Sequence, residues 1–560
     1  MMGILQIAAV IVIVVLLVKP LGTYLYNVFR NETNATDRLF VFAERPIFAL
    51  IGLKQPKGMT WKTYGLSFLV TNIVLATVSY LLLRIQNLLP LNPNGIDGME
   101  QTLTFNTVIS FMTNTNLQHY SGETGLSYFS QMAVITMMMF TSAATGLCVA
   151  IAFVRAITGK GETVGNFFED FVKAHTRVFL PLAFIVAIVL VALRVPQTLG
   201  PSLTVTGLEG QQQSIPVGPV ASLESIKHLG TNGGGFFGAN SSHPFENPSP
   251  LTNVIEIVSM WCLGAALPYT YGLFAKNRKQ GWVIFSAMMI LFVAFLSLAY
   301  AAETSGNPAI DRLGIDASQG SMEGKEVRFG IAQSALFTTV TTAATTGSVN
   351  NMHDTLTPLG SITPLALMML NNVFGGKGVG LANMLMYAML GVFLAGLLVG
   401  RTPEFLGKKI EAREMKLIAI AILVHPLIIL APAAIALVSG AGQAGITNPG
   451  YHGITQVLYE YASSAANNGS GFEGLADNTT FWNVTTGLVM LFGRYISMIA
   501  LLAVGGSLLR KQRVSEAIGT FRTDNGLFVG VLVGTVLIIG ALTFLPGIVL
   551  GPVAEYLTIR

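Results

Sequence analysis

Four short strings along the chain combine hydroxyl, amide and glycine residues in a way that suits the binding of a monovalent cation. A dehydrated cation needs a ring of oxygen atoms to replace its water, and backbone carbonyls from several loops can supply that ring. Glycine helps such a backbone turn its carbonyls inward, because it tolerates positive φ angles. The four strings are Thr113–Tyr120, Gly230–Phe237, Thr341–Ser348 and Ala465–Phe472.

Every oxygen that these strings offer is neutral. No carboxylate lies inside them, although Glu123 and Glu473 flank two of them. A divalent cation would favour several acidic ligands, so the strings indicate a monovalent ion, and potassium ahead of sodium because carbonyl rings suit the larger, weakly hydrated ion. The candidate ligands are the hydroxyls of Thr113, Thr115, Thr231, Thr345 and Thr346, the amides of Asn114, Asn116, Gln118, Asn232, Asn467 and Asn468, and the backbone near Gly233, Gly234, Gly347 and Gly469.

The strings recur at nearly constant spacing. Taking Asn116, Gly233, Gly347 and Gly469 as anchors, the intervals are 117, 114 and 122 residues. Each string follows a short apolar stretch that cannot span a membrane and precedes a long one that can, which predicts a repeated unit of helix, re-entrant half-helix, polar strand and helix. Clusters of Gly, Asn, Ser and Thr are more often surface loops, but four at one period argue for a structural repeat.

Composition places these strings in a membrane protein. Of the 560 residues, 52% are hydrophobic and only 11% are charged, whereas soluble domains carry about 25% charged residues. This balance excludes a soluble enzyme, a disordered chain and a fibrous protein. The two cysteines exclude a disulfide framework, and the net charge of +4 is too small to indicate nucleic acid binding. Four histidines expected on one side, at 119, 243, 353 and 452, do not show the spacing of a metal site.

Ten stretches are long and apolar enough to cross a bilayer. The first has no preceding Lys or Arg and no small-residue cleavage site after it, so we expect a retained helix and not a signal peptide. The loops at 19–62, 155–177, 276–279, 401–416 and 510–522 hold 23 of the 32 Lys and Arg residues. The positive-inside rule makes them cytoplasmic and both termini external. The stretches are Gly3–Leu21, Tyr64–Leu83, Leu126–Val154, Val178–Leu193, Leu251–Phe274, Gly281–Tyr300, Leu381–Val399, Leu417–Val438, Phe481–Leu509 and Leu527–Phe544.

A fifth break lies within the third repeat, and it suggests a gate. Residues 371–380 interrupt an apolar segment with four glycines, which disfavours a continuous helix. Lys377 would act there as a positive stopper, or it would snorkel to the cytoplasm. Arg494 lies within the last repeat's helix, where a buried charge is a functional candidate. The gate or path residues are Asn371, Gly375, Gly376, Lys377, Gly378 and Arg494.

We therefore expect an all-α polytopic membrane protein with ten transmembrane helices and four pseudo-symmetric, potassium-channel-like helix–pore loop–helix repeats. The expected segments are an N-terminal helix and cytoplasmic loop at 1–62, repeats at 63–155, 176–280, 281–400 (with the internal gate) and 416–510, and a C-terminal helix at 524–560.

Several motifs resemble one family, the potassium-binding A subunits of bacterial Kdp pumps (the KdpA family). The first two strings are similar to its pore loops, including the residues 238–248 and 121–124 that follow them. The resemblance extends to nearly the whole chain. Further motifs are Arg401–Ile410 with Arg413–Lys416, Asn467–Phe472 and Leu550–Glu555.

This resemblance implies a channel-like protein in the bacterial plasma (inner) membrane that works with three partners: the B subunit, which is a P-type ATPase, the C subunit and the small single-helix F subunit of the Kdp complex. It implies that potassium is the substrate, selected outside and passed through the membrane to the ATPase partner, with no covalently bound cofactor. Two positions depart from the family pattern: Thr345-Thr346-Gly347 in the third string, and Asn371-Asn372 near the pore exit.

The chain should not hydrolyse ATP by itself. Its Gly-Lys pairs, for example Gly159-Lys160, are not followed by Ser or Thr, as a phosphate-binding loop requires. Two other hypotheses stay open at this point: a self-sufficient potassium channel or secondary transporter of the same fold, and an assembly scaffold whose pore is vestigial. Transport by the isolated chain in liposomes would favour the first of these.

Overall fold

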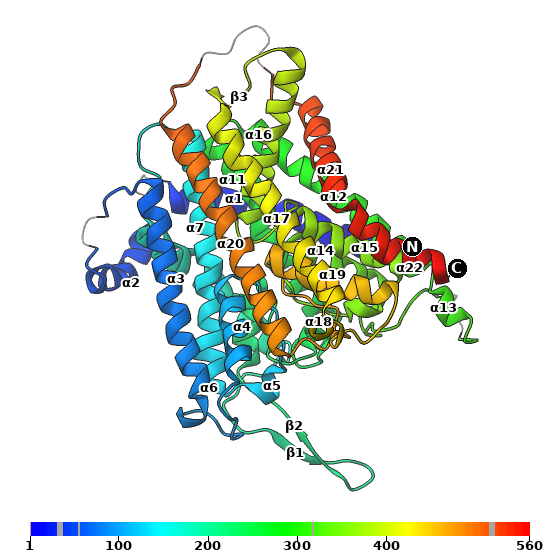
Figure 1. Ribbon diagram of the computed structural model, residues 1–560. Helices are drawn as coiled ribbons and strands as arrows, with labels where there is room; N and C mark the ends of the chain where they lie inside the picture. The colour runs from blue at the N-terminus through cyan, green and yellow to red at the C-terminus, as the bar shows by residue number, and fades with distance from the viewer. Residues whose placement is uncertain (1, 31–36, 54–55, 316–318, 515–520, 560) are drawn as a thin grey trace.

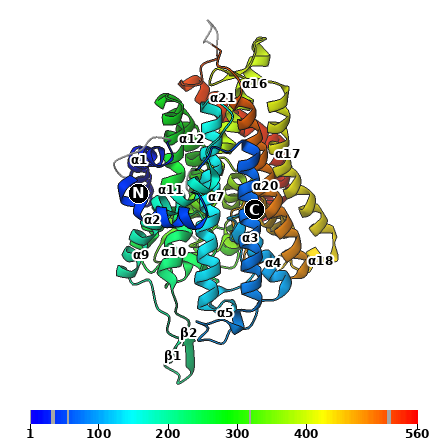
Figure 2. The ribbon, with the colours of Figure 1, turned by 90° about the vertical axis from the view of Figure 1, so that its left-hand side faces the viewer.

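The computed structural model describes residues 2–30, 37–53, 56–315, 319–514 and 521–559. Within these ranges ten helical segments are long and apolar enough to span a membrane, which confirms the ten predicted helices (Figures 1 and 2). They are α1 (Met2–Phe29), α3 (Trp61–Arg84), α6–η2–α7 (Tyr128–Thr158), α8–η3–α9 (Phe167–Ala192), α11 (Pro250–Phe274), α12–α13 (Arg278–Asp311), α16 (Val379–Val399), α17 (Ala412–Val438), α20 (Thr480–Leu509) and α21–η6–α22 (Gly526–Ile559).

The fourth helix begins earlier than hydropathy predicted, at Phe167 and not at Val178. The added segment contains charged residues, which lower its mean hydropathy and hide the helix from a hydropathy search. In the structure these charges form ion pairs. Arg177 Nε donates to Glu44 Oε1 over 2.6 Å, and Asp170 accepts from Arg155 Nη1 over 2.7 Å. Paired charges at a helix end can stay buried, so the helix extends into a region that sequence alone marks as a loop.

Four shorter helices precede the four strings, as the repeat predicts. They are buried among the long helices, and each ends just before its string or within the first three residues of it. The long helix that follows each string completes the unit, except in the third repeat, where it is split into α15 and α16. The four short helices are α4 (Gln101–Met112), α10 (Val220–Leu229), α14 (Gly330–Ala343) and α19 (Tyr451–Ala466), and α15 is Pro358–Leu370.

The helices approach closely where glycine replaces a side chain. A Cβ built on Gly22 of α1 would lie 2.9 Å from the carbonyl oxygen of Ala266 on α11. In lipid the hydrophobic effect does not drive helices together, so small residues stabilise their contact by allowing close van der Waals packing. Helix α1, although outside the four repeats, is therefore firmly packed against the second one.

Two short strand pairs lie at opposite ends of the molecule, one inside the second repeat and one between the third and fourth repeats. The hairpin of β1 (Leu203–Thr206) and β2 (Gln212–Ile215) lies at one end, and β3 (Glu404–Phe405), which pairs with β4 (Lys408–Lys409), lies at the other (Figure 1). The remaining elements are α2 (Asp37–Leu50), η1 (Gln86–Leu88), α5 (Gly122–Gly125), η4 (Asn240–Ser242), η5 (His353–Thr355) and α18 (Gly440–Gln443); within the spans, α6 is Tyr128–Ser130, η2 Gln131–Thr136, α7 Met137–Thr158, α8 Phe167–Lys173, η3 Ala174–Phe179, α9 Leu180–Ala192, α12 Arg278–Thr304, α13 Pro308–Asp311, α21 Gly526–Ile548, η6 Val549–Val553 and α22 Ala554–Ile559.

Candidate cation-binding site

The four strings meet and form a closed ring, which we call the loop ring (residues 113–116, 230–233, 344–347 and 466–469). Asn114 Nδ2 donates to the carbonyl of Thr231 over 2.7 Å and joins the first string to the second. A Cβ on Gly233 would lie 2.9 Å from Gly347 Cα, one on Gly347 would meet the backbone of Asn468, and one on Gly469 would meet Thr115 O. Each string therefore touches the next, and the fourth returns to the first.

One hydrogen bond recurs in all four strings. The N–H group in the third position of each segment donates to the carbonyl five residues earlier, at the end of its own short helix. These bonds join Thr115 to Ser110 (2.9 Å), Asn232 to Lys227 (2.7 Å), Thr346 to Thr341 (2.7 Å) and Asn468 to Ser463 (2.9 Å). The backbone donors are thereby turned toward the surrounding protein.

The carbonyl oxygens of the same four residues have no hydrogen-bond partner. Among the described residues, those of Thr115, Asn232, Thr346 and Asn468 accept no hydrogen bond. Buried carbonyls are normally satisfied, so these four are available to a ligand. The four short helices also end at the ring, and each C-terminus carries about half a negative charge. The site is therefore electronegative without any carboxylate, which suits a monovalent cation.

The backbone of the ring repeats as closely as its hydrogen bonds do. Asn114, Thr231, Thr345 and Asn467 occupy equivalent positions, and their φ angles are 62°, 51°, 46° and 56°. Positive φ is uncommon for residues other than glycine. The sequence predicted that glycine turns the backbone, but in the structure Asn and Thr supply much of the positive φ, and Gly233 does not have it.

Most of the amide side chains expected near the ion are used as braces. Asn467 Nδ2 donates to Met490 O and Thr115 Oγ1, both over 3.0 Å, and Asn468 Nδ2 donates to Thr341 O over 2.9 Å. Gln118 accepts from Gly235 N (2.8 Å) and donates to Gly235 O (3.1 Å), which clamps the first string to the second beside Gly234. Asn232 Nδ2 donates to Met139 O over 3.2 Å.

The predicted hydroxyls divide into bonded and free groups. Thr113 Oγ1 donates to Ile109 O over 2.8 Å and lies 2.7 Å from Thr115 Oγ1, and Thr231 Oγ1 donates to Gly230 O. Within the described residues the buried Thr346 hydroxyl has no partner, and neither polar atom of the Asn116 side chain has one.

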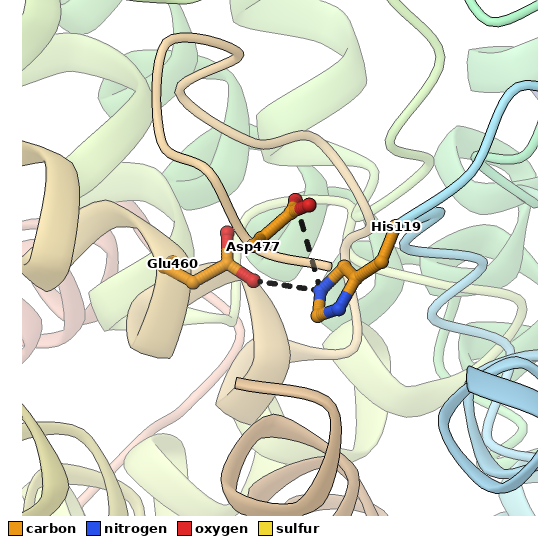
Figure 3. A group of neighbouring side chains, drawn as sticks. All are labelled: His119, Glu460 and Asp477. Carbon is orange, nitrogen blue, oxygen red and sulfur yellow. Dashed lines mark hydrogen bonds and ion pairs between the residues drawn. The ribbon is translucent and has the colours of Figure 1, made fainter. Parts of the chain in front are cut away.

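A cavity of about 300 Å³ adjoins one face of the ring, and we call it the mouth cavity. Asn116, Gly347 and Gly469 of the ring line it, together with His119 and Asp477. His119 Nε2 lies 3.2 Å from Glu460 Oε1 and 3.8 Å from Asp477 Oδ2 (Figure 3). Burial lowers the pKa of His119, but Asp477 and Glu460 outweigh that effect and raise it to about 9. These residues join the first repeat to the fourth.

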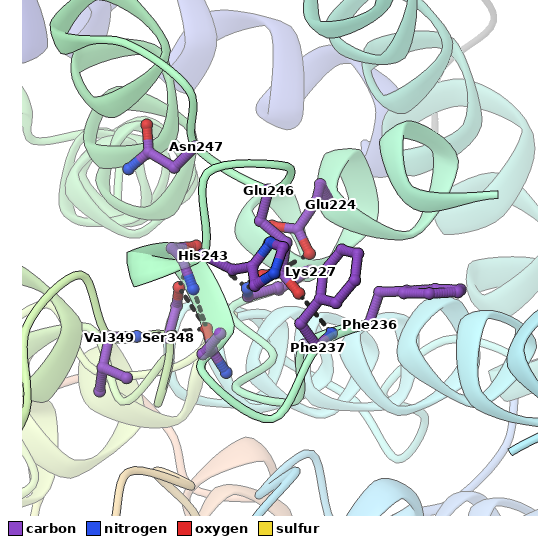
Figure 4. Close-up of polar contacts among 12 residues, drawn as sticks. Glu224, Lys227, Phe236, Phe237, His243, Glu246, Asn247, Ser348 and Val349 are labelled. Atoms are coloured by element: carbon purple, nitrogen blue, oxygen red, sulfur yellow. Dashed lines mark hydrogen bonds and ion pairs between the residues drawn. The ribbon is translucent and has the colours of Figure 1, made fainter. Parts of the chain in front are cut away.

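A buried charged network, which the sequence motifs did not predict, supports the second string. Lys227 Nζ donates to Glu246 Oε2 over 2.7 Å and to Glu224 Oε2 over 3.0 Å (Figure 4). Glu246 also accepts from the N–H of Phe237 over 2.8 Å. Glu224 and Lys227 stand three residues apart on one helix face, and that pair inside a re-entrant helix was the available signal.

Two further residues position the ring. Asn240 Nδ2 donates to Gly233 O over 2.7 Å, and its Oδ1 accepts from Ser348 of the third string over 3.2 Å. On α7, Ser142 Oγ lies 2.9 Å from Asn114 Oδ1. Asn240 follows the second string closely, within the motif at 238–248, but its role as a brace between two strings could not be read from that motif. Ser142 lies 22 residues after the first string, and no local pattern marks it.

The fifth break forms a loop directly beside the ring, and we call it the inner loop (residues 371–378). Gly376 N donates to Ala344 O over 2.7 Å, and Gly378, at φ 107°, lies against Gly146 and Ala150 of α7. Gly375 O accepts from Gly380 N over 2.6 Å, which starts α16.

Two positive charges are buried near the inner loop. Lys377 is 1% exposed and its Nζ donates to Met260 O of α11 over 3.0 Å, so it does not snorkel to either surface. Arg494 donates to Ser142 O over 3.2 Å. A Cβ on Gly146 would lie 2.8 Å from Arg494 Nη2 and 3.0 Å from Lys377 O, so α7, α20 and the inner loop converge there.

Unpaired polar atoms gather around the same loop. Within the described residues, Asn371 Oδ1, Asn383 Oδ1 and both polar atoms of Asn372 are buried and have no hydrogen-bond partner. Asn371 and Asn383 line a cavity of about 30 Å³, enough for about one water molecule. The arrangement could solvate a small cation next to the ring.

The comparisons with known proteins agree with this geometry. The family model described as the potassium-transporting ATPase A subunit (KdpA) matches residues 8–557. The chain belongs to this family. A KdpA-family relative from Geobacillus kaustophilus (strain HTA426), named potassium-transporting ATPase potassium-binding subunit, is 64% identical over 555 residues, which cover 99% of each chain. Family membership favours the pump subunit over the self-sufficient channel or transporter.

A solved structure shows the same fold at low sequence similarity. The crystal structure of the potassium transporter TrkH from Vibrio parahaemolyticus aligns with a TM-score of 0.54 and 14% identity, over 90% of this KdpA-family chain and 99% of that chain. This likeness concerns the fold with its pore-loop repeats.

Proposed function

We propose that this chain is the potassium-binding subunit of an ATP-driven uptake complex and that the loop ring is its potassium filter. The recurring bond from the third-position N–H to the carbonyl five residues earlier supports this best. It directs four donors away from the centre and leaves four equivalent carbonyls free. A ring of neutral oxygens at four helix C-termini suits a dehydrated potassium ion.

We further propose that the inner loop controls the ion's path after the ring. Lys377 supplies a fixed positive charge that opposes free passage, and Arg494 holds α7 and α20 together at the same point. The buried amides of Asn371 and Asn372 would solvate the ion as it leaves the ring. From there it would pass to the B subunit, a P-type ATPase, in a complex completed by the C and F subunits.

The basic loops support a topology in the bacterial plasma membrane. We propose that the β3–β4 end faces the cytoplasm, because the loop at 401–416 carries five Lys and Arg residues. The β1–β2 end and both termini would then face outward. Labelling of single cysteines introduced in β1 and β4 of intact cells would test this: reaction at β4 alone would reverse the topology.

The filter is tested by Gly233→Asp in the assembled complex, with ATP hydrolysis measured against potassium concentration. The Asp Cβ would press on Gly347 Cα and Thr346 O, both 2.9 Å away. We expect the potassium concentration for half-maximal activity to rise at least about tenfold, or about 1.4 kcal/mol. Gly440→Asp, at an exposed position beyond the end of α17 where a Cβ meets nothing within 4 Å, controls for the added charge. An unchanged concentration would exclude the ring as the binding site.

A second measurement addresses coupling to the ATPase. Purified chain in liposomes should show no rapid potassium flux, because transport through the complex requires the catalytic cycle of the ATPase partner. Rapid flux by the chain alone would favour the channel or secondary transporter. Normal transport by a complex carrying Gly233→Asp would favour the vestigial scaffold.

A further inference from the structure

The contact between the first and fourth repeats contains a group of side chains with the chemistry of a transition-metal site. His119 Nε2, a Glu460 oxygen and an Asp477 oxygen all lie within 4.8 Å of one another. The ring nitrogen is 3.2 Å from Glu460 Oε1 and 3.8 Å from Asp477 Oδ2. Ligands at about 2.0–2.1 Å from a tetrahedral zinc ion stand about 3.3 Å apart, so small rotations would bring all three to bonding distance.

The surrounding residues fix the side chains in a ligand-ready arrangement. Asn483 Oδ1 lies 2.7 Å from His119 Nδ1, while the Asn483 amide nitrogen donates to Thr102 Oγ1 over 3.2 Å. Nδ1 is therefore the donor, and Nε2 faces the carboxylates. Metal-binding histidines usually have their second nitrogen held in this way.

The second carboxylate oxygen of one ligand is buried and unpaired. Within the described residues, Glu460 Oε2 has no hydrogen-bond partner, and the Glu460 side chain is 1% exposed. A buried carboxylate oxygen without a partner is costly, and a metal ion bound by both oxygens of Glu460 would satisfy it. This observation is independent of the distances among the three residues.

The group is also accessible, unlike a second one in the same molecule. Asp477 is 25% exposed and lines the mouth cavity with His119. By contrast, Glu224, His228 and Glu256 also form a three-ligand group, but they are buried and Lys227 Nζ already lies 3.0 Å from Glu224. An ammonium group there takes the place of a metal ion.

We propose that His119, Glu460 and Asp477 bind a divalent transition-metal ion, with Zn²⁺ as the best match, in the wall of the mouth cavity. One nitrogen and two carboxylate oxygens suit zinc, whereas calcium and magnesium prefer oxygen ligands alone. The fourth position faces the cavity and would hold water. Binding displaces any proton on Nε2, since the metal needs that lone pair.

The direct test is zinc binding by the purified full chain in detergent, measured by competition with a chromogenic chelator at constant potassium concentration. We expect one zinc ion per chain, and His119→Gln and Asp477→Asn should each weaken binding at least about tenfold, in line with known effects at metal sites. His243→Gln, which alters a histidine stacked on Phe237, should leave it unchanged. Absence of stoichiometric binding, or unchanged affinity in both ligand variants, would overturn the proposal.

Cobalt gives a second readout that does not depend on competition. Co²⁺ in the wild-type chain should give the visible absorption of a tetrahedral site, and His119→Gln should lose it. Asp477 lies outside any helix and is partly exposed, so Asp477→Asn is the variant that should leave folding intact, which thermal melting would verify. An octahedral spectrum in the wild type would contradict the proposed ligand set.

Zinc should also hinder potassium access, because a divalent charge would sit in the cavity that Asn116, Gly347 and Gly469 line. In the complex, micromolar Zn²⁺ should lower potassium-stimulated ATP hydrolysis, and Asp477→Asn should relieve that inhibition. This consequence rests on the proposed function, whereas zinc binding does not. Zinc binding without inhibition would therefore count against the role of the mouth cavity and not against the metal site.

Discussion

The loop ring and the inner loop are both breaks rich in Gly and Asn inside a bundle of apolar helices, yet they treat their polar atoms differently. In the ring, Asn114, Asn467 and Asn468 each donate to a backbone carbonyl, over 2.7, 3.0 and 2.9 Å. In the inner loop, within the described residues, Asn372 makes no side-chain hydrogen bond and Asn371 Oδ1 has none. Most amides of the ring are therefore braced, with Asn116 as the exception, whereas the inner loop keeps several buried groups that a passing ion or a rearrangement would satisfy.

Charge separates the two regions as well. The ring segments contain no ionisable side chain, and their negative potential comes from carbonyls and helix ends. The inner loop carries Lys377 and lies next to Arg494, close to the same Gly146 position. Under the proposed function, one region attracts a cation and the other resists it. The difference suggests that the loop ring selects the ion and the inner loop gates it, and mutations can test the two roles separately.

The largest effect should come from filling the ring. Gly469 has a φ of +107° and its Cβ would meet Thr115 O and the carbonyl carbon of Asn116. Strain and steric overlap should lower potassium affinity in Gly469→Ala at least about tenfold, since one left-handed non-glycine residue alone costs about 1–2 kcal/mol. The potassium dependence of ATP hydrolysis by the complex measures this.

Gly530→Ala, in open space on α21, is the control for Gly469→Ala and should behave like the wild type. If Gly469→Ala retained wild-type potassium affinity, the four strings could not be in contact as the structure shows.

Removing the charge of the inner loop should affect flux and spare affinity. In Lys377→Met, the barrier to a cation passing within about 6 Å would fall by about 3 kcal/mol at an effective dielectric constant of 20. Potassium leak through the chain in liposomes should rise at least about tenfold, while half-saturation in the complex changes less than about twofold. Lys408→Met is the matched control, because Lys408 is also buried and donates to carbonyls, those of Ala156 and Gly159. Equal leak in both variants would remove the special role of Lys377.

The regular features of the ring were readable from sequence because they are local and periodic. The spacing of Asn116, Gly233, Gly347 and Gly469 predicted four equivalent strings, and their burial at the ends of short helices follows from the same repeat. Hydropathy found the ten spans for the same reason: each helix must bury its own backbone polar groups in lipid.

The roles of individual side chains could not be predicted in this way. Asn114 bonds a carbonyl 117 residues away, and His119 meets a carboxylate 341 residues away. Nothing in a local pattern separates an amide that faces an ion from one that braces a neighbouring loop. The position of the Lys377 side chain could not be predicted either. It stays in the interior because its ammonium group donates to the carbonyl of Met260 on another helix.

A smaller contrast is expected between amides of the two regions. Asn114→Leu removes the 2.7 Å bond to Thr231 O and the 2.9 Å contact with Ser142 Oγ. At about 1 kcal/mol for a hydrogen bond, potassium affinity should fall about fivefold. Asn372→Leu removes two atoms that have no described partner, so thermal stability should be maintained or rise. The sharp distinction between braced and free amides would be wrong if Asn372→Leu lowered the melting temperature as much as Asn114→Leu.

The smallest effect should come from Thr346→Val, which tests whether the ring binds through its backbone or its side chains. Within the described residues the Thr346 hydroxyl is buried without a partner, so an apolar group of the same shape should cost little or add slightly to stability. The carbonyl is kept, and potassium affinity should stay within about twofold of the wild type. Thr341→Val is the matched comparison, because Thr341 Oγ1 accepts from Gly347 N over 3.0 Å, and its loss frees a backbone donor inside the ring. A greater loss of affinity in Thr346→Val than in Thr341→Val would mean that the ion is bound by hydroxyls, and the backbone carbonyls would lose their place as the main ligands.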